Sequence, residues 1–181
     1  LAHTIHTPDM PPKLDDRAAR PRTLSKPHAK TTDDRQALRD VIREGHPRFF
    51  LGSPSAPHPL TAKYPAPAAR GDSTEALVHN CGCAAGIYTS AILLPLCATL
   101  LESFGALDQL AGFVSEHGRR FYQEPAPADR TVTLRRATPA DPPVPAAYVH
   151  PDAFKLRDSD ASALQVVPGA AGARRAWVSG S

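Results

Sequence analysis

The chain has 181 residues, which at roughly 100 to 200 residues per domain predicts one domain or one piece of a larger one. Hydrophobic residues make up 41% of it, enough for a modest core, and its 20 prolines and 11 glycines stay below the roughly 25 to 30% that marks low-complexity chains. The net charge of +3 comes without a long basic run and therefore does not indicate a nucleic-acid partner.

The cysteines and the longest apolar stretch indicate where in the cell the chain is expected. Cys81, Cys83 and Cys97 cannot form an even disulfide framework and lack the Cys-x-x-Cys spacing of zinc ribbons, so we expect a reducing, cytoplasmic location. The longest apolar stretch, residues 91–101, is shorter than the roughly 20 residues that cross a bilayer, so no membrane span is predicted. The N-terminus has no signal-peptide pattern and begins without methionine, which suggests a piece of a longer protein.

The first third of the chain alternates between loop and regular structure. Five prolines within residues 8–30 predict a loop. Acidic residues in a first turn, apolar residues at helical spacing and a closing Gly45 predict a helix over 33–44. The apolar run 48–52 predicts a buried strand. A helix followed by a strand is typical of an α/β fold with parallel strands.

Two apolar helices are expected next. Residues 59–75 form a proline-rich loop, after which a largely buried helix is predicted from Thr89 to Phe104, bent near Pro95. A second helix from Leu107 to Glu116 is expected to end at Gly118.

The rest of the chain has little periodicity. Residues 123–160 are predicted to be mostly irregular or disordered, although 131–134 could form a strand. Residues 164–177 could form a hairpin around a Pro-Gly-Ala-Ala-Gly turn, docked on a core elsewhere.

The eight histidines are candidates for chemistry. Chemistry in α/β folds lies just past the carboxyl ends of strands, which singles out His58. His3 and His6 could form a metal-binding pair, but the β-branched residues between them disfavour a helix, and exposure near a chain end is the alternative. Ordinary surface-loop positions are expected for His28, His46, His117 and His150.

The small residues of Cys-Gly-Cys-Ala-Ala-Gly at 81–86 would let the backbone approach a ligand near a helix start. The alternative is a tight turn with two buried thiols. Thiolate catalysis is not indicated, because no histidine or cation adjoins either cysteine in the sequence.

Gly-Ser-Pro-Ser-Ala-Pro-His at 52–58, followed by the 81–86 motif, resembles the end of dihydroorotase, a zinc amidohydrolase of pyrimidine biosynthesis, in its single-domain bacterial and fungal form. The resemblance covers nearly the whole chain but only the C-terminal half of the family enzyme. Its further segments are 23–30, 101–107, 113–115, 120–122, 167–168 and 177–178.

The resemblance implies part of a TIM (β/α)₈ barrel, with two zinc ions bridged by a carbamylated lysine and a hydroxide that attacks the cyclic amide. We therefore expect an α/β fold in which residues 1–122 form an incomplete barrel portion, 123–163 a proline-rich irregular segment and 164–181 a tail packed on the barrel. A complete barrel needs about 250 residues, so a homo-oligomer or a complementary chain is expected to cover the open side.

The resemblance also implies roles for individual residues of this chain. His58 matches the family's substrate-contacting histidine, Ala84 a residue whose backbone helps hold the substrate carboxylate, and Lys26 a backbone contact. Pro54 stands where the family has its catalytic aspartate, and proline offers neither a carboxylate nor an N–H. Asp9 falls at the position of a zinc-binding histidine.

Two hypotheses follow. The chain is a dihydroorotase-like protein, related to the reversible hydrolysis of dihydroorotate to N-carbamoyl-aspartate but inactive alone and without retained zinc. Alternatively, it is a non-catalytic remnant that acts as a structural or interaction module.

Overall fold

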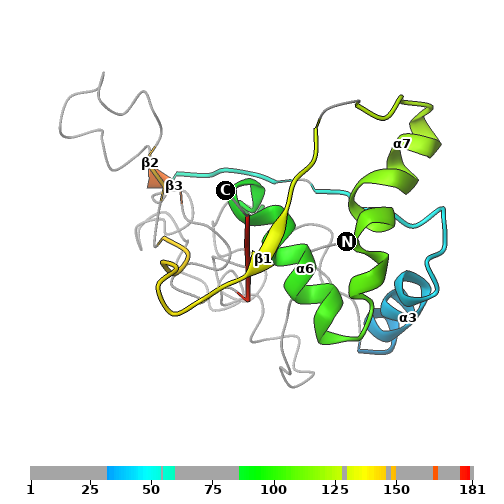
Figure 1. Ribbon diagram of the computed structural model, residues 1–181, viewed down its shortest axis with the longest axis horizontal. Helices are drawn as coiled ribbons and strands as arrows, with labels where there is room; N and C mark the ends of the chain where they lie inside the picture. The colour runs from blue at the N-terminus through cyan, green and yellow to red at the C-terminus, as the bar shows by residue number, and fades with distance from the viewer. Residues whose placement is uncertain are drawn as a thin grey trace, which may run out of the picture.

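The computed structural model describes residues 32–53, 55–59, 86–127, 130–145, 148–149, 165–166 and 176–179. Within these residues, the short strands β1 (Leu134–Arg136) and β4 (Trp177–Ser179) lie beside helix α6 (Leu93–Ser103). Helices α3 (Thr32–Arg43) and α7 (His117–Tyr122) lie to the right of α6 in the view of Figure 1. The expected loops at 8–30 and 59–75, apart from Pro59, lie outside the described part.

Helix α3 (Thr32–Arg43) confirms the helix predicted over 33–44. Asp33 and Asp34 occupy its first turn and Arg43 its last, which is the arrangement that a helix dipole favours. Gly45 adopts a positive φ of 68° and donates its N–H to the carbonyl of Ile42 over 3.0 Å. This left-handed residue ends the helix as the sequence predicted.

The strand predicted at 48–52 is wrong. Residues 49–53 belong to no strand, and the Leu51 N–H donates to the carbonyl of Phe113, a helical residue, over 2.9 Å. The parallel pairing expected of an α/β fold is found instead slightly later, as an isolated parallel bridge between Ser55 and Ile87. Neither a continuous parallel sheet nor a closed barrel is present among the described residues.

The helix predicted from Thr89 to Phe104 is confirmed, as a 3₁₀ turn η3 (Ser90–Ile92) that leads into α6 (Leu93–Ser103). Its irregularity lies at Ile92, with φ −129° and ψ 13°. Pro95 therefore falls in the first turn of α6, where the missing N–H of proline removes no helical hydrogen bond.

The following helix does not end at Gly118. After the 3₁₀ turn η4 (Leu107–Gln109), helical structure continues through a π-helical segment η5 (Gly112–Glu116) and α7 (His117–Tyr122) to a left-handed Gln123. Gly118 serves close packing instead, because a Cβ at this position would lie 3.3 Å from Cδ2 of Phe50. His117, expected in a surface loop, lies in this helix.

The tail forms two short antiparallel pairs. β1 (Leu134–Arg136) pairs with β4 (Trp177–Ser179), and β2 (Tyr148–Val149) pairs with β3 (Gln165–Val166). The strand predicted at 131–134 overlaps β1 only at Leu134. The predicted hairpin over 164–177 is wrong, because β3 and β4 pair with different partners.

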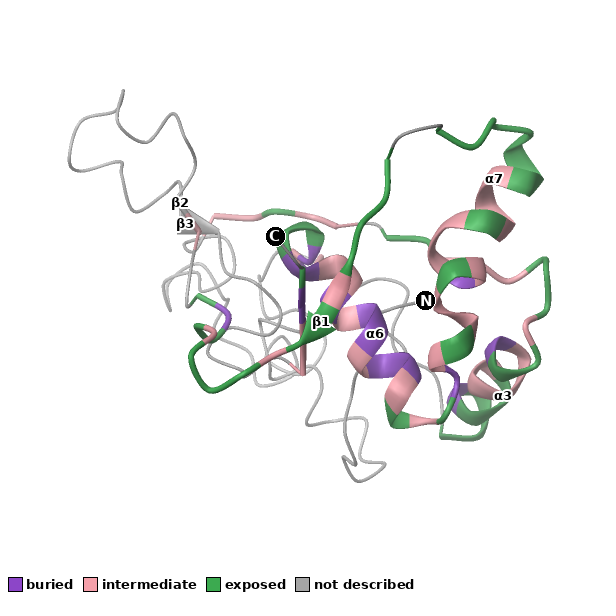
Figure 2. Ribbon diagram, in the orientation of Figure 1, coloured by how far each residue is buried: buried purple, intermediate pink, exposed green. Residues whose placement is uncertain are grey.

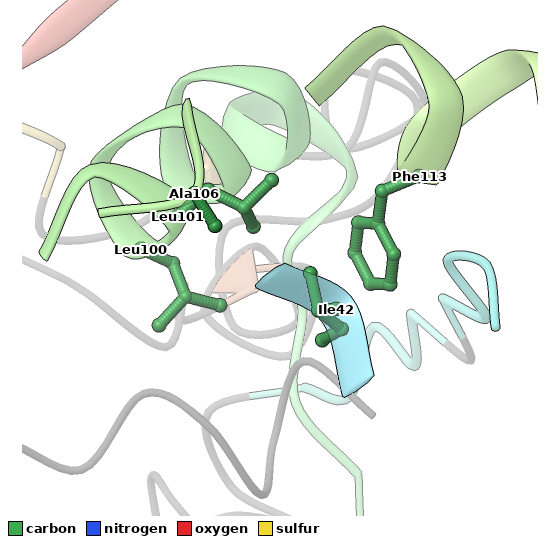
Figure 3. Packing of buried hydrophobic residues seen from close by; sticks show 5 residues of the cluster. All are labelled: Ile42, Leu100, Leu101, Ala106 and Phe113. Atoms are coloured by element: carbon green, nitrogen blue, oxygen red, sulfur yellow. The ribbon is translucent and has the colours of Figure 1, made fainter. Parts of the chain in front are cut away.

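The core lies where α3, α6 and the helix over 110–122 meet. Figure 3 shows its central residues, and Figure 2 shows the buried positions along α6. These residues are Ile42, Leu100, Leu101, Ala106 and Phe113, with Leu51, Phe104, Leu110 and Val114 partly buried around them. No helix in the described ranges is long and apolar enough to span a membrane.

Candidate functional site

His58 is half-buried and is the one residue predicted to contact substrate that the structure describes. Lys26, Pro54, Ala84 and Asp9 lie outside the described residues. The site is therefore built from His58, its neighbours in the 52–58 motif and the end of the 81–86 motif.

The described ends of the two motifs meet in space, although the 22 residues 59–80 lie between the motifs in the sequence. Ser55 and Ile87 form the parallel bridge, and the Ala56 N–H donates to the Ile87 carbonyl over 3.1 Å. Position 86 closes the second motif, so this pairing brings it beside the first. Sequence reasoning had singled out both motifs, and the structure brings their described ends together.

Gly86 lies directly against His58. Its φ is +134°, and a Cβ at this position would lie 2.9 Å from Nε2 of His58 and 2.5 Å from the Cβ of Ala56. Any other residue would be strained and would collide with both neighbours. Glycine thus lets the backbone of the second motif pass close to the imidazole of the first.

Ser55 is a site residue that sequence reasoning missed. Its Oγ accepts the Thr89 N–H over 2.9 Å and the Ser90 N–H over 3.0 Å, at the start of the helix formed by η3 and α6. A helix start leaves its first N–H groups without helical partners, and Thr89 supplies no side-chain cap of its own. The sequence gives only part of the information needed to predict this role. Serine is a common capping residue, but no local pattern indicates that it caps a helix that begins 35 residues later.

The described residues do not fit a zinc pair. No group of three or more histidine, cysteine, aspartate or glutamate side chains lies together among them. Burial raises the pKa of the Cys97 thiol to about 11, which keeps it protonated and a poor metal ligand or nucleophile. What this arrangement offers chemically is an imidazole and adjacent backbone, which can hydrogen-bond a carboxylate.

The chain is similar in sequence to known dihydroorotases. The chain is 53% identical over 185 residues to a dihydroorotase of Mycosarcoma maydis, covering 91% of this chain and 47% of the relative. It is 40% identical to a dihydroorotase of Alkalilimnicola ehrlichii, over 87% of this chain and 37% of that protein. No model of a known protein family matches the chain.

Two crystal structures share its fold. One is dihydroorotase from Saccharomyces cerevisiae in complex with 5-fluoroorotic acid, with a TM-score of 0.68, 27% identity, and coverage of 99% of this chain and 41% of that one. The other is dihydroorotase from Campylobacter jejuni, with a TM-score of 0.66, 26% identity, and coverage of 93% and 41%.

The structural likeness places the chain in the fold class of these two enzymes, over the part that they share. The sequence identity shows that the chain is homologous to dihydroorotases over part of their length. It spans less than half the length of the curated relatives that it matches.

Proposed function

We propose that the chain is part of a dihydroorotase-like protein of pyrimidine biosynthesis, whose family reaction is the reversible hydrolysis of dihydroorotate to N-carbamoyl-aspartate. The observation that carries this proposal is the junction of the 52–58 and 81–86 motifs, where His58 lies against Gly86. The identity to dihydroorotases over most of the chain supports it. In this proposal the whole protein has the TIM-barrel architecture and zinc of the family.

The contribution of this part is to hold the substrate carboxylate. The His58 imidazole can donate a hydrogen bond to a carboxylate, and backbone N–H groups near Ala84 can add others. Lys26 is proposed to add a backbone contact. These groups include no arginine, whose guanidinium would pair with a carboxylate through two charge-assisted hydrogen bonds, and each such bond that is missing costs about 1.5 to 3 kcal/mol. Binding by these groups alone is therefore expected to be weak, on the order of millimolar.

We further propose that the 181 residues alone do not hydrolyse dihydroorotate. Pro54 replaces the carboxylate that would take a proton, and the described residues assemble no metal cluster. Of the family's metal positions, only Asp9 offers a ligand here, and one carboxylate does not hold a zinc pair.

The test is elemental analysis of the purified chain, with dihydroorotate turnover followed in the ultraviolet. We expect no stoichiometric zinc pair and no turnover. Pro54→Asp should leave both at background because one restored carboxylate does not complete the ligand set, and Pro54→Ala is the matched control for removing the proline. Two tightly held zinc ions per chain, or turnover by the aspartate variant, would contradict the proposal.

The second candidate function is an interaction module, and an exposed aromatic cluster favours it. Phe121 and Tyr122 are 63% and 66% exposed, and their ring centroids lie 5.5 Å and 6.0 Å from that of Phe50. Exposed apolar patches mark interaction surfaces. The Mycosarcoma maydis relative is about twice as long as this chain and so contains a region that this chain does not match. We propose that a separate chain corresponding to that region covers the aromatic cluster.

Mixing experiments test this partner. The N-terminal half of the Mycosarcoma maydis dihydroorotase, supplied as a separate chain, should form a one-to-one complex with this chain in light scattering. The double variant Phe121→Ser/Tyr122→Ser should weaken the complex at least about tenfold, whereas Val132→Ser, equally exposed at 63%, should not. Self-association that the double variant abolishes would assign the surface to a second copy instead. Absence of any association would contradict an interaction role for the cluster.

A further inference from the structure

Three hydrogen bonds join the His58 segment to the start of a buried helix. Two of them converge on one atom, Oγ of Ser55, which accepts the N–H groups of Thr89 and Ser90. The third runs from the Ala56 N–H to the Ile87 carbonyl. They lie within three residues of His58 on one side and within four residues of Gly86 on the other, and these two residues are in close contact.

The capping interaction is long-range. An ordinary N-cap residue belongs to its own helix and stabilises that helix alone. Here the N-cap residue Thr89 makes no side-chain cap, and a serine from another part of the chain supplies the acceptor. A cap of this kind also fixes the distance between the two segments that it joins.

The helix that receives the cap is a firm support. α6 contributes Cys97, Ala98 and Leu101, each at most 1% exposed, and its last turn lies in the central core cluster. Close packing of this kind permits little movement of the helix. Ser55 is tied to the start of η3, which runs directly into α6, and is therefore held in place relative to the core.

We propose that Ser55 is a positioning residue: its hydroxyl ties the His58 segment to the start of the η3–α6 helix and so holds the imidazole against Gly86 for binding the substrate carboxylate. This inference rests on the proposed function, because it assigns a task to the site that binds the carboxylate. Ser55 itself does not contact the substrate in this proposal.

The first measurement follows the His58 imidazole by NMR in the full 181-residue chain. The wild type should show a nuclear Overhauser contact between the His58 ring and the Gly86 α-protons. Ser55→Ala should lose this contact, and Ser55→Thr, which keeps a hydroxyl, should retain it. Ser53→Ala makes the same change at an exposed serine two residues away and should leave the contact unchanged.

The second measurement is titration with dihydroorotate, read from the His58 resonances. Ser55→Ala should raise the Kd about tenfold, and Ser55→Thr should stay within about twofold of the wild type. If the wild type shows the contact, and only Ser55→Ala loses it, but dihydroorotate binds to neither protein, the proposed function fails while the positioning role stands. If Ser55→Ala keeps both the contact and the affinity, the positioning role is overturned.

A double variant that caps the helix locally distinguishes the positioning of His58 from stabilisation of the helix. In Ser55→Ala/Thr89→Asp, the aspartate can cap the helix from its own N-cap position. We expect this double variant to regain the unfolding midpoint but not the His58–Gly86 contact or the affinity. Recovery of all three would show that Ser55 acts only as a helix cap and would overturn the proposal. The double variant also keeps the test valid if Ser55→Ala does not fold.

Discussion

In the helical region, Ile42 of α3, Leu101 of α6 and Phe113 of η5 are buried together in one apolar cluster, each at most 2% exposed. At the site junction, by contrast, His58 and Gly86 are brought together by hydrogen bonds and one close backbone approach. Apolar burial is non-directional and tolerates local adjustment, whereas hydrogen bonds and a left-handed glycine tolerate little. The helical region therefore supplies stability, and the junction supplies geometry.

The largest expected effect is in the helical region. Leu101→Ala removes a side chain that is 0% exposed and should lower the free energy of unfolding by about 2 to 5 kcal/mol. Urea denaturation followed by circular dichroism measures this loss. Leu94→Ala, on the same helix but only partly buried, is the control and should cost clearly less. Equal losses at both positions would show that the cluster around Leu101 does not carry the stability.

A smaller effect is expected at the junction. Gly86→Ala forces a residue with a Cβ into φ +134° and against Ala56 and His58, which should cost about 1 to 3 kcal/mol. Urea midpoints should show this loss, and the His58 ring resonances should shift.

Two other glycines separate the causes of the Gly86 effect. At Gly105, with φ +71°, a Cβ meets nothing within 4 Å, so Gly105→Ala reports backbone strain alone. At Gly52, which has neither a positive φ nor a neighbour within 4 Å, Gly52→Ala should change stability by less than about 0.5 kcal/mol. If Gly86→Ala costs no more than Gly105→Ala, the contact with His58 has no energetic weight.

The contrast between local packing and long-range contacts also explains which secondary-structure elements the sequence predicted correctly. Helix α3 and the η3–α6 helix were predictable because apolar spacing and terminal residues are local signals. The strand at 48–52 was wrong because Leu51 pairs with the Phe113 carbonyl, a partner that no local pattern names. The false helix end at Gly118 has a similar cause, since that glycine accommodates the distant Phe50 ring.

Within the candidate site too, local sequence indicated one feature and could not indicate another. His58 could be named from the motif that contains it, and the structure places it against Gly86, while its contact with substrate stays a prediction. The role of Ser55 was not, because it depends on two N–H groups far along the chain. Side chains that act through long-range hydrogen bonds become recognisable only when the partner segments are placed in space.

The smallest effect is expected where the tail meets α6. Oε2 of Glu102 accepts the Trp177 indole N–H over 3.0 Å and an Arg136 N–H over 2.9 Å, and both contacts, the indole foremost, lower the pKa of this carboxyl. A lowered folded-state pKa stabilises the fold above about pH 4.3, where unfolded glutamate is ionised, and this contribution is lost as the pH falls through the folded-state pKa. The partly exposed setting keeps it small.

Trp177→Phe isolates this contribution because it removes the indole N–H and keeps an aromatic ring beside Arg136, whose guanidinium carbon lies 4.6 Å from the indole centroid. Unfolding free energies measured between pH 6 and pH 3 should fall less steeply for the variant than for the wild type. Asp141, whose pKa is lowered by Arg135 and Thr138, also contributes to the acid slope, so Asp141→Asn should flatten it by a separate amount. If the slope of Trp177→Phe matches the wild type while that of Asp141→Asn does not, the indole hydrogen bond to Glu102 does not contribute to the acid dependence.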